Sequence, residues 1–460
     1  MGRAEGIVAM SKATDIRVKH VETKTNRFTY RTPIKFGGRV VVDAVVFDVE
    51  MEVETRDGRR GRGVGSMPMA NAWAWPSRVV GGEQALAAMM AFAERFPGRA
   101  VDCGAVGHPL EISHAWASLY GSLAAEIAAE MQLAEPLPVL AQLVAASPVE
   151  AAVHDAYGKT LGANSYNLLG PDYVNADLSH YLSAEFQGEY LDRYTRREPQ
   201  SRLPLYHLVG ALDPLEAADV AAPVGDGLPE TLEEWIGYNG LTHLKIKLAG
   251  DDLAWDVDRV VAIDRVAERA QARRGCVSWN YSLDFNEKCA SVQYVLDFLA
   301  QVETRSPRGL ARVQYIEQPT HRDLRAFPEN RMHAAARIKP VVIDESLTDF
   351  SSLLLARELG YSGVALKACK GHSEALLMGA AAQKYGLFLC VQDLTCIGRS
   401  FLHSASLAAR IPTIAAIEGN GRQYCPAGNA GWDQRFPTMF TIRDGSVGAG
   451  ALTGPGLWGE

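Results

Sequence analysis

Residues 340–368 read PVVIDESLTDFSSLLLARELGYSGVALKA and contain one complete unit of the predicted fold. The apolar run at 340–343 predicts a short strand that ends at Asp344, and the run at 363–366 predicts another that ends at Lys367. The segment between them is amphipathic, as is typical of a helix. Such an alternation of buried strands and amphipathic helices indicates a parallel sheet.

The same pattern repeats on both sides of this unit. Strands are predicted at 243–248, 276–285, 312–317, 340–344, 363–368, 387–392 and 414–418. Each of them ends in, or runs into, an ionisable residue: Lys247, Asp284, Glu317, Asp344, Lys367, Asp393 and Glu418. Successive members lie 23 to 37 residues apart, close to one unit of a barrel in which about 250 residues make eight. The sequence therefore predicts an α/β fold with a (β/α)8-type barrel, which places catalytic residues at its strand ends.

The rest of the chain divides into four predicted parts. Residues 1–13 are expected to form a flexible tail. Residues 14–147 contain strands followed by helices and predict an α+β domain. The barrel is expected at 148–420, beginning with a helix at Pro148 and carrying a polar insertion near 171–200. Residues 421–460 are expected to pack back on the first domain.

Composition excludes several classes of protein. A net charge of −8, without a basic run, argues against a nucleic-acid-binding protein. No apolar run approaches the roughly 18 residues of a membrane helix. The seven cysteines include no C-x-x-C pair, so neither a disulfide framework nor a structural zinc site is predicted. With no secretory signal at the start of the sequence, we expect a cytoplasmic protein.

Lys245 and Lys247 share one face of the strand at 243–248, because side chains alternate along a strand. In a barrel that face points inward, where burial and like charge lower the pKa of a lysine and make it a general base. The alternative is an edge strand with a solvent-exposed lysine face.

Asp284, Glu317 and Asp344 end three consecutive strands, so their carboxylates are expected to converge. Carboxylates that converge need a cation, and hard oxygen ligands with open positions suit Mg²⁺. The alternative for any one of them is a helix N-cap. Lys367 lies four strands beyond Lys247, roughly opposite it in an eight-stranded barrel. Lys370 is the alternative to Lys367 as the second acid/base residue.

Taken together, these motifs resemble the enolase superfamily, and within it the muconate-lactonizing subgroup of the mandelate racemase/muconate lactonizing enzyme family. The resemblance covers roughly 15–170 and 235–425. The motifs that carry it are K-x-K at 245–247, D-x-N at 284–286, E-Q-P at 317–319, D-E-S at 344–346 and the lysine strand ending at Lys367. The segments 30–34 and 61–65 are similar to that family's capping domain.

The resemblance implies roles for these residues and a reaction. Asp284, Glu317 and Asp344 would bind Mg²⁺, Lys247 and Lys367 would be the acid/base pair, and Lys245 would lie beside the substrate carboxylate. The implied reaction removes the proton α to the carboxylate of a small-molecule acid, leading to racemisation, epimerisation, elimination or cycloisomerisation. The family also implies a homo-oligomer, a dimer or octamer.

Four further residues are candidates for substrate binding: Asn286, Asp393, Glu418 and Trp73. No histidine ends the strand at 387–392, which argues against a His–Asp base. The chain ends its last strand in Glu418-Gly419-Asn420, whereas dipeptide epimerases carry two aspartates there. For Trp73, packing against a partner subunit is an alternative of equal weight to substrate binding. A metal-dependent aldolase and a non-catalytic binding protein on the same fold remain alternative functions.

Overall fold

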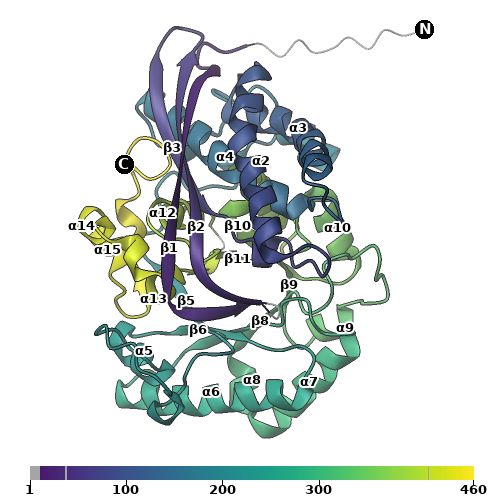
Figure 1. Cartoon of the computed structure of the whole chain (residues 1–460), viewed down its shortest axis with the longest axis vertical. Helices are drawn as coiled ribbons and strands as arrows, with labels where there is room; N and C mark the ends of the chain where they lie inside the picture. Colours follow the sequence, from purple (N-terminus) through teal and green to yellow (C-terminus); the bar gives the residue numbers. More distant parts are fainter. Residues whose placement is uncertain (1–10, 37–38, 413) are drawn as a thin grey trace.

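The structure, a computed structural model, describes residues 11–36, 39–412 and 414–460. It has a closed parallel barrel and, beside it, an antiparallel sheet with helices (Figure 1). Both the barrel and the N-terminal α+β domain are therefore confirmed. Most of the predicted tail, residues 1–10, lies outside the described residues.

Eight parallel strands form the barrel. They are β5 (Leu203–Val209), β6 (His243–Lys247), β7 (Asn280–Asp284), β8 (Val313–Glu317), β9 (Val341–Ile343), β10 (Gly363–Lys367), β11 (Phe388–Gln392) and β12 (Ile414–Glu418). The barrel closes where β12 pairs with β5, with Ile417 opposite Leu205. The predicted strands match β6 to β12, with the largest difference at the start of β7.

Helices cover the outside of the barrel, as expected of a βα repeat. They are α5 (Leu232–Asn239), α6 (Leu253–Arg273), α7 (Val292–Arg305), α8 (Pro307–Arg312), α9 (His333–Ala336), α10 (Phe350–Glu358), α11 (His372–Lys384) and α12 (Arg399–Arg410). In Figure 1, α6, α7 and α8 line the lower side of the barrel.

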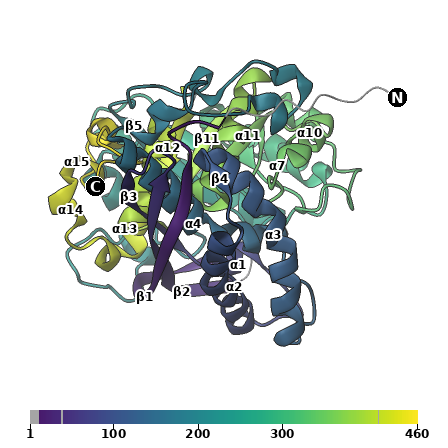
Figure 2. The same cartoon turned by 90° about the horizontal axis from the view of Figure 1, so that it is seen from above.

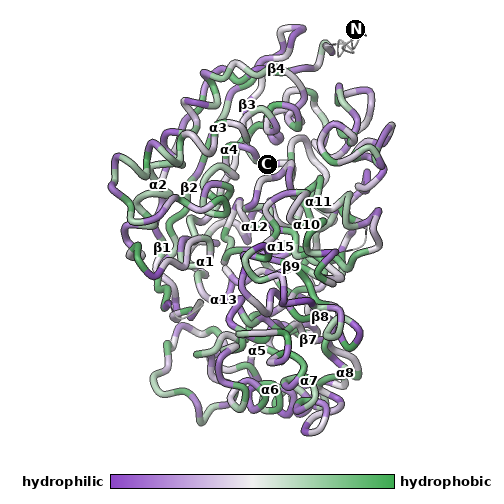
Figure 3. The backbone as a smooth tube through the Cα atoms, turned by 90° about the vertical axis from the view of Figure 1, so that its right-hand side faces the viewer, coloured by the Kyte–Doolittle hydropathy of each residue, from purple (hydrophilic) through white to green (hydrophobic). Residues whose placement is uncertain are grey.

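The N-terminal domain combines a four-stranded sheet with helices. Its strands, in the order β3-β2-β1-β4, are β1 (Ile16–Phe36), β2 (Arg39–Thr55), β3 (Arg60–Pro68) and β4 (Val106–Gly107). Its helices are α1 (Asn71–Ala74), α2 (Gly82–Asp102) and α3 (Pro109–Glu130). Figure 2 shows α1 beside α2 at the edge of the molecule. Hydrophobic and hydrophilic residues alternate along α2 in Figure 3, and its apolar face is buried.

The long strand β1 reaches the mouth of the barrel. Its residue Ile34 packs with Leu208 of β5 and with Tyr424 of the short helix α13 (Gly421–Tyr424). The N-terminal domain therefore covers the end of the barrel at which the strands finish.

Helix α4 (Val139–Leu161) joins the two parts, and it spans the predicted boundary between residues 147 and 148. The predicted helix start at Pro148 is wrong, because the helix begins nine residues earlier and continues through this proline. Proline lacks the N–H that would bond to the carbonyl of Val144. The hydroxyl of Ser147 donates to that carbonyl instead, at 2.9 Å, and so replaces the missing bond.

Glycines on β3 allow α4 to lie against the sheet. A Cβ atom at Gly63 would be 2.0 Å from the backbone nitrogen of Ala156, and one at Gly65 would be 1.9 Å from the carbonyl oxygen of Pro148. No side chain fits in this space, so the glycines let the helix and strand backbones approach closely.

Residues 421–460 contact both parts of the molecule. Cys425 packs with Ala44 and Val46 of β2, whereas the short strand β13 (Ser446–Val447) pairs with β5 of the barrel. Residues 171–200 form short 3-10 helices, and the backbone of Tyr194 accepts a hydrogen bond from Gln383 of α11. All seven cysteines are described, and each is a free thiol. Among the described residues, no helix has the length and apolar character to cross a membrane.

Candidate active site

The two lysines of β6 point into the barrel and are buried. The Nζ atom of Lys245 lies 2.8 Å from Glu317 Oε1, 2.6 Å from Glu418 Oε1 and 3.0 Å from Asp284 Oδ2. The Nζ atom of Lys247 forms an ion pair with Asp284 and donates to Asn286 Oδ1 at 3.1 Å. Lys245 therefore contacts carboxylates from three strands of the barrel, and Lys247 contacts one, on the adjacent strand β7.

The three predicted metal-binding acids lie on adjacent strands at one end of the barrel. Asp284 pairs in register with Glu317, and Asp344 directly follows β9. All three are fully buried. Asp344 holds two ammonium groups, with Oδ2 2.8 Å from Lys367 Nζ and Oδ1 3.1 Å from Lys370 Nζ.

Trp73 of α1 covers this end of the barrel. The Nζ atom of Lys367 lies 4.1 Å from the centre of the indole ring, a cation–π contact. The indole nitrogen donates to Glu345 Oε1 at 3.1 Å. Lys370 is farther from the ring, at 5.7 Å, and donates to the backbone carbonyl of Asp344. The ring thus lies against Lys367 more closely than against the alternative, Lys370.

The protonation of the lysines differs from the sequence prediction. Burial opposes charge on Lys245, but Asp284, Glu317 and Glu418 outweigh it and hold its pKa well above the ordinary value. Burial likewise opposes charge on Lys367, yet Asp344 raises its pKa. The sequence predicted a lowered pKa for Lys245, and that prediction is therefore wrong. The sequence pattern did not show that carboxylates would lie in direct contact with the ammonium groups.

The pKa values of the acids Glu317 and Asp284 shift in opposite directions. Burial first, and then the negative charge of Asp284, raises the pKa of Glu317 well above its ordinary value. Burial also acts on Asp284, but the positive charges of Lys245 and Lys247 lower its pKa. Glu317 is therefore the acid whose negative charge is least well compensated.

The donor atoms fit a hard divalent cation. Four carboxylates and four lysines meet at this end of the barrel: Asp284, Glu317, Asp344 and Glu418 with Lys245, Lys247, Lys367 and Lys370. A lysine that acts as a base must lose its proton, and carboxylates then outnumber cations. Within the described residues, no three His, Cys, Asp or Glu side chains are arranged around one point as a finished metal cage. Lys245 instead lies between Asp284 and Glu317, so metal binding requires side-chain rearrangement.

The other predicted site residues have different surroundings. The backbone N–H of Asn286 donates to Asp284 Oδ1 at 2.8 Å, and its side chain accepts from Lys247. Asp393 accepts from the backbone N–H groups of Cys396 and Asn420, both at 3.2 Å. Burial, followed by the charge of Glu418, raises the pKa of Asp393 to about 7. Asp393 therefore anchors two loops, whereas Asn286 orients a lysine.

Three residues that support the site were not predicted. Gln392 donates to Glu317. Gln318 accepts from the backbone N–H of Asp344 at 3.0 Å. Arg322 pairs with Glu287 at 2.6 Å and donates to the carbonyl of Trp73 at 3.0 Å. Gln318 stands inside the quoted E-Q-P motif, which is a signal that was present, but Arg322 belongs to no motif.

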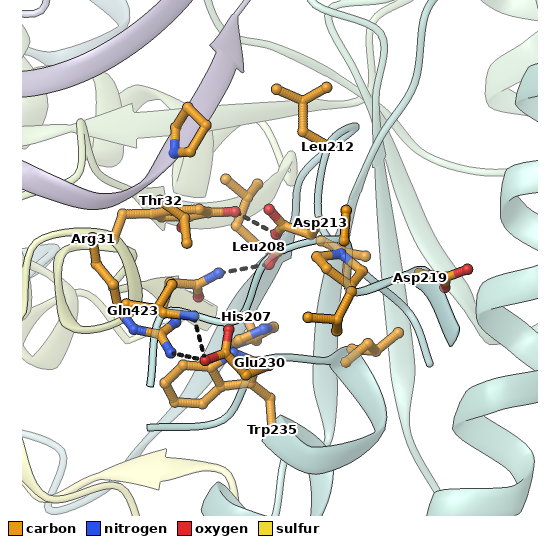
Figure 4. Close-up of a pocket in the computed structure, with 18 of the residues that line it drawn as sticks. Arg31, Thr32, His207, Leu208, Leu212, Asp213, Asp219, Glu230, Trp235 and Gln423 are labelled. Atoms are coloured by element: carbon orange, nitrogen blue, oxygen red, sulfur yellow. Dashed lines mark hydrogen bonds and ion pairs between the residues drawn. The ribbon is translucent and has the colours of Figure 1, made fainter. Parts of the chain in front are cut away.

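Three of the cavities in the described part of the chain lie around this end of the barrel. One of about 430 Å³ is lined by Lys247 and Asn286, and another of about 870 Å³ is lined by Asn286 and Trp73. The third, of about 240 Å³, lies beside β5 and is shown in Figure 4. In it, Gln423 donates to the carbonyl of Leu208 at 2.9 Å. None of the predicted site residues lines this third cavity.

Comparison with known proteins agrees with the geometry. Residues 227–457 match the sequence model of the family described as enolase C-terminal domain-like. A muconate lactonizing enzyme from Pseudomonas fluorescens, solved with muconolactone, is 17% identical, with a TM-score of 0.59 over 96% of this chain and 95% of that chain.

Two epimerases have similar structures. An L-Ala-D/L-Glu epimerase from Bacillus subtilis is 18% identical, with a TM-score of 0.61 over 96% of this chain and 98% of that chain. A dipeptide epimerase from Enterococcus faecalis V583, complexed with Mg and a dipeptide, is 18% identical, with a TM-score of 0.57 over 87% of this chain and 90% of that chain. No curated protein matches the sequence significantly.

Proposed function

Because the chain belongs to the enolase superfamily, we propose that it is a Mg²⁺-dependent isomerase or lyase that removes the proton α to the carboxylate of a small-molecule acid. The motifs K-x-K, D-x-N, E-Q-P and D-E-S favour the muconate-lactonizing subgroup within that superfamily. The enolate that forms when this proton is removed is common to racemisation, epimerisation and elimination.

The opposed arrangement of Lys247 and Lys367 carries the proposal. Lys247 ends β6, and Lys367 ends β10, four strands away in a closed barrel of eight. The strands β7, β8 and β9, which bring Asp284, Glu317 and Asp344, lie between them. An acid held near these carboxylates would have one lysine on each face, as transfer of a proton from one face to the other requires.

Each residue then has a role. When bound by Asp284, Glu317 and Asp344, Mg²⁺ would stabilise the negative charge that develops on the substrate carboxylate. Lys245, buried next to two of these acids, adds positive charge at the same place. One of Lys247 and Lys367 removes the α proton, and the other returns a proton or assists a leaving group.

Hydrogen–deuterium exchange at the α carbon tests this proposal. The purified protein is incubated with Mg²⁺ in D₂O and a set of 2-hydroxy acids, dipeptides and muconolactone, and loss of the α-proton signal is followed by NMR. We expect exchange with at least one acid, and we expect EDTA to abolish it. Lys247→Met and Lys367→Met should each slow exchange at least about 100-fold, the usual contribution of a general base.

Lys24→Met is the control, because Lys24 is exposed on β1 and outside the site. It should leave exchange unchanged. Absence of exchange with every acid, in a protein that still binds Mg²⁺, would contradict the proposed function.

A further inference from the structure

The cavity of about 240 Å³ beside β5 lies outside the reaction centre (Figure 4). Its walls come from residues 31–33 of β1, from residues between 207 and 235 around the end of β5 and the start of α5, and from α13. None of the four carboxylates and four lysines that meet at the strand ends lines it. Pockets for drug-sized ligands measure about 300–1,000 Å³, so this cavity fits a smaller molecule. The proposed function leaves the cavity without a role.

A positive and a negative side chain, Arg31 and Glu230, lie side by side in the wall of this cavity (Figure 4). The Nη2 atom of Arg31 is 3.6 Å from Glu230 Oε1. Asp226 binds the Nε and Nη2 atoms of the same guanidinium. Among the described residues, neither Arg31 Nη1 nor Glu230 Oε2 has a hydrogen-bond partner. The wall therefore offers a free cationic donor next to a free carboxylate oxygen.

The other two acids in the wall are already used by the protein itself. Asp213 accepts hydrogen bonds from the backbone N–H of Gly210, at 2.8 Å, and from the hydroxyl of Tyr424. Asp219 accepts from two backbone N–H groups of the loop that follows β5, both at 3.0 Å. These two carboxylates hold the loop in place, which leaves Arg31 and Glu230 as the charged pair for a ligand.

Gln423 of α13 adds an acceptor that lacks a donor. Its side chain lines the cavity, and the residue is 4% exposed. The Nε2 atom donates to the carbonyl of Leu208 at 2.9 Å, and this bond fixes the orientation of the amide (Figure 4). The Oε1 atom is then buried without a hydrogen-bond partner among the described residues. A buried acceptor without a donor is unfavourable, so an N–H group of a ligand that reaches it would be stabilised.

Much of the remaining wall is aliphatic. Two of these side chains are partly open to solvent, with Leu212 49% and Val224 41% exposed. Exposed apolar side chains in a concave site favour a ligand with some apolar surface. The aliphatic residues of the wall include Leu212, Val220, Val224 and Leu232.

We propose that this cavity binds a free α-amino acid with a short aliphatic side chain, at a site separate from the reaction centre. The carboxylate of the amino acid complements the free guanidinium N–H groups of Arg31. Its ammonium group complements Glu230 Oε2 and supplies the donor that Gln423 Oε1 lacks. Its side chain lies against the aliphatic part of the wall.

Binding of L-leucine, measured by calorimetry, tests the inference. The titration is made once with excess EDTA, which removes the metal that the proposed reaction centre needs to hold a carboxylate, and once with Mg²⁺. We expect a site of equal affinity in both, because no predicted metal ligand lines the cavity. Two compounds of matched shape serve as controls: 4-methylpentanoate lacks the ammonium group, and 3-methylbutylamine lacks the carboxylate. Each should bind at least about tenfold more weakly, since a charge-assisted hydrogen bond is lost.

Glu230→Gln removes the negative charge and keeps an oxygen that can accept from the backbone N–H groups of Val224 and Gly225. It should weaken L-leucine binding at least about tenfold. Glu233→Gln is the matched control, because Glu233 lies in the first turn of α5, pairs with Arg273 and does not line the cavity. It should leave the affinity unchanged.

Circular dichroism establishes that both variants are folded, and the three compounds test the wild-type protein even if Glu230→Gln is not. The inference is overturned if L-leucine does not bind in EDTA, if it binds only with Mg²⁺, or if the three compounds bind equally well. A folded Glu230→Gln variant with wild-type affinity would also overturn it. None of these results bears on α-proton exchange, so the proposed function stands or falls separately.

Discussion

Replacement of Gly63 by alanine tests how closely α4 and β3 must approach. The added Cβ atom would lie 2.0 Å from Ala156 N and 2.5 Å from both Ala152 O and Ala156 Cα. All three are backbone atoms, so no side-chain rotation can relieve the overlap. An ordinary contact starts near 3.4 Å, so the helix must move away from the strand by 3.4 − 2.0 = 1.4 Å.

The cost follows from the packing that such a shift disturbs. Overpacking a core usually costs about 1–3 kcal/mol. Because a buried helix of 23 residues must shift as a unit, we expect the upper end, about 3 kcal/mol of unfolding free energy. Urea unfolding followed by circular dichroism measures this loss as a lower midpoint at an unchanged slope.

Gly121→Ala provides the control, because Gly121 lies within α3 and a Cβ atom there meets nothing within 4 Å. That variant should gain roughly 0.5–1 kcal/mol, since alanine favours the helix. If Gly63→Ala unfolds at the wild-type midpoint, the close approach of helix and strand is not as described.

Three further changes have defined outcomes. Ser147→Ala leaves a buried carbonyl of α4 without a hydrogen-bond donor, and urea unfolding should show an unfolding free energy lower by about 1–2 kcal/mol. Ser118→Ala removes a hydrogen bond of the same kind at the surface and should leave the unfolding free energy almost unchanged. Burial raises the pKa of Glu150 from 4.5 to about 7, so its contribution to stability is present below pH 4.5 and is lost as the pH rises to 7. The unfolding free energy of Glu150→Gln, relative to that of the wild type, should therefore increase as the pH rises across this range. A difference between the two proteins that does not change with pH would contradict the assignment. Mg²⁺ at one hundred times its Kd should add about 2.7 kcal/mol to the unfolding free energy of the wild type. The Asp284→Asn variant should not show this increase. An equal increase in the variant would exclude Asp284 as a ligand.

Much of the barrel could be predicted from the sequence, because its signals are local. Each strand is a short apolar run, and the charged residue that ends it marks the open end of the barrel. Lys247 and Asp284 show this well, because the spacing that predicted their strands also brings them into register.

Features that depend on tertiary contacts could not be predicted. Pro148 is a helix-starting signal in sequence, and only the bond from Ser147 explains why the helix runs through it. The pKa of Lys367 depends on the distance to Asp344. Arg322 joins the domains through backbone carbonyls, which leave no mark in a sequence.

The position of Trp73 affects the timing of any reaction at Lys367. The side chain of Lys367 is 4% exposed, and the indole lies against it. With α1 held in place by Arg322, an acid can reach this lysine only after the indole ring has turned aside, so each turnover includes an opening and a closing step. Where that motion is slower than proton transfer, deuterium at the α carbon leaves the turnover number unchanged, whereas a more viscous solvent lowers it.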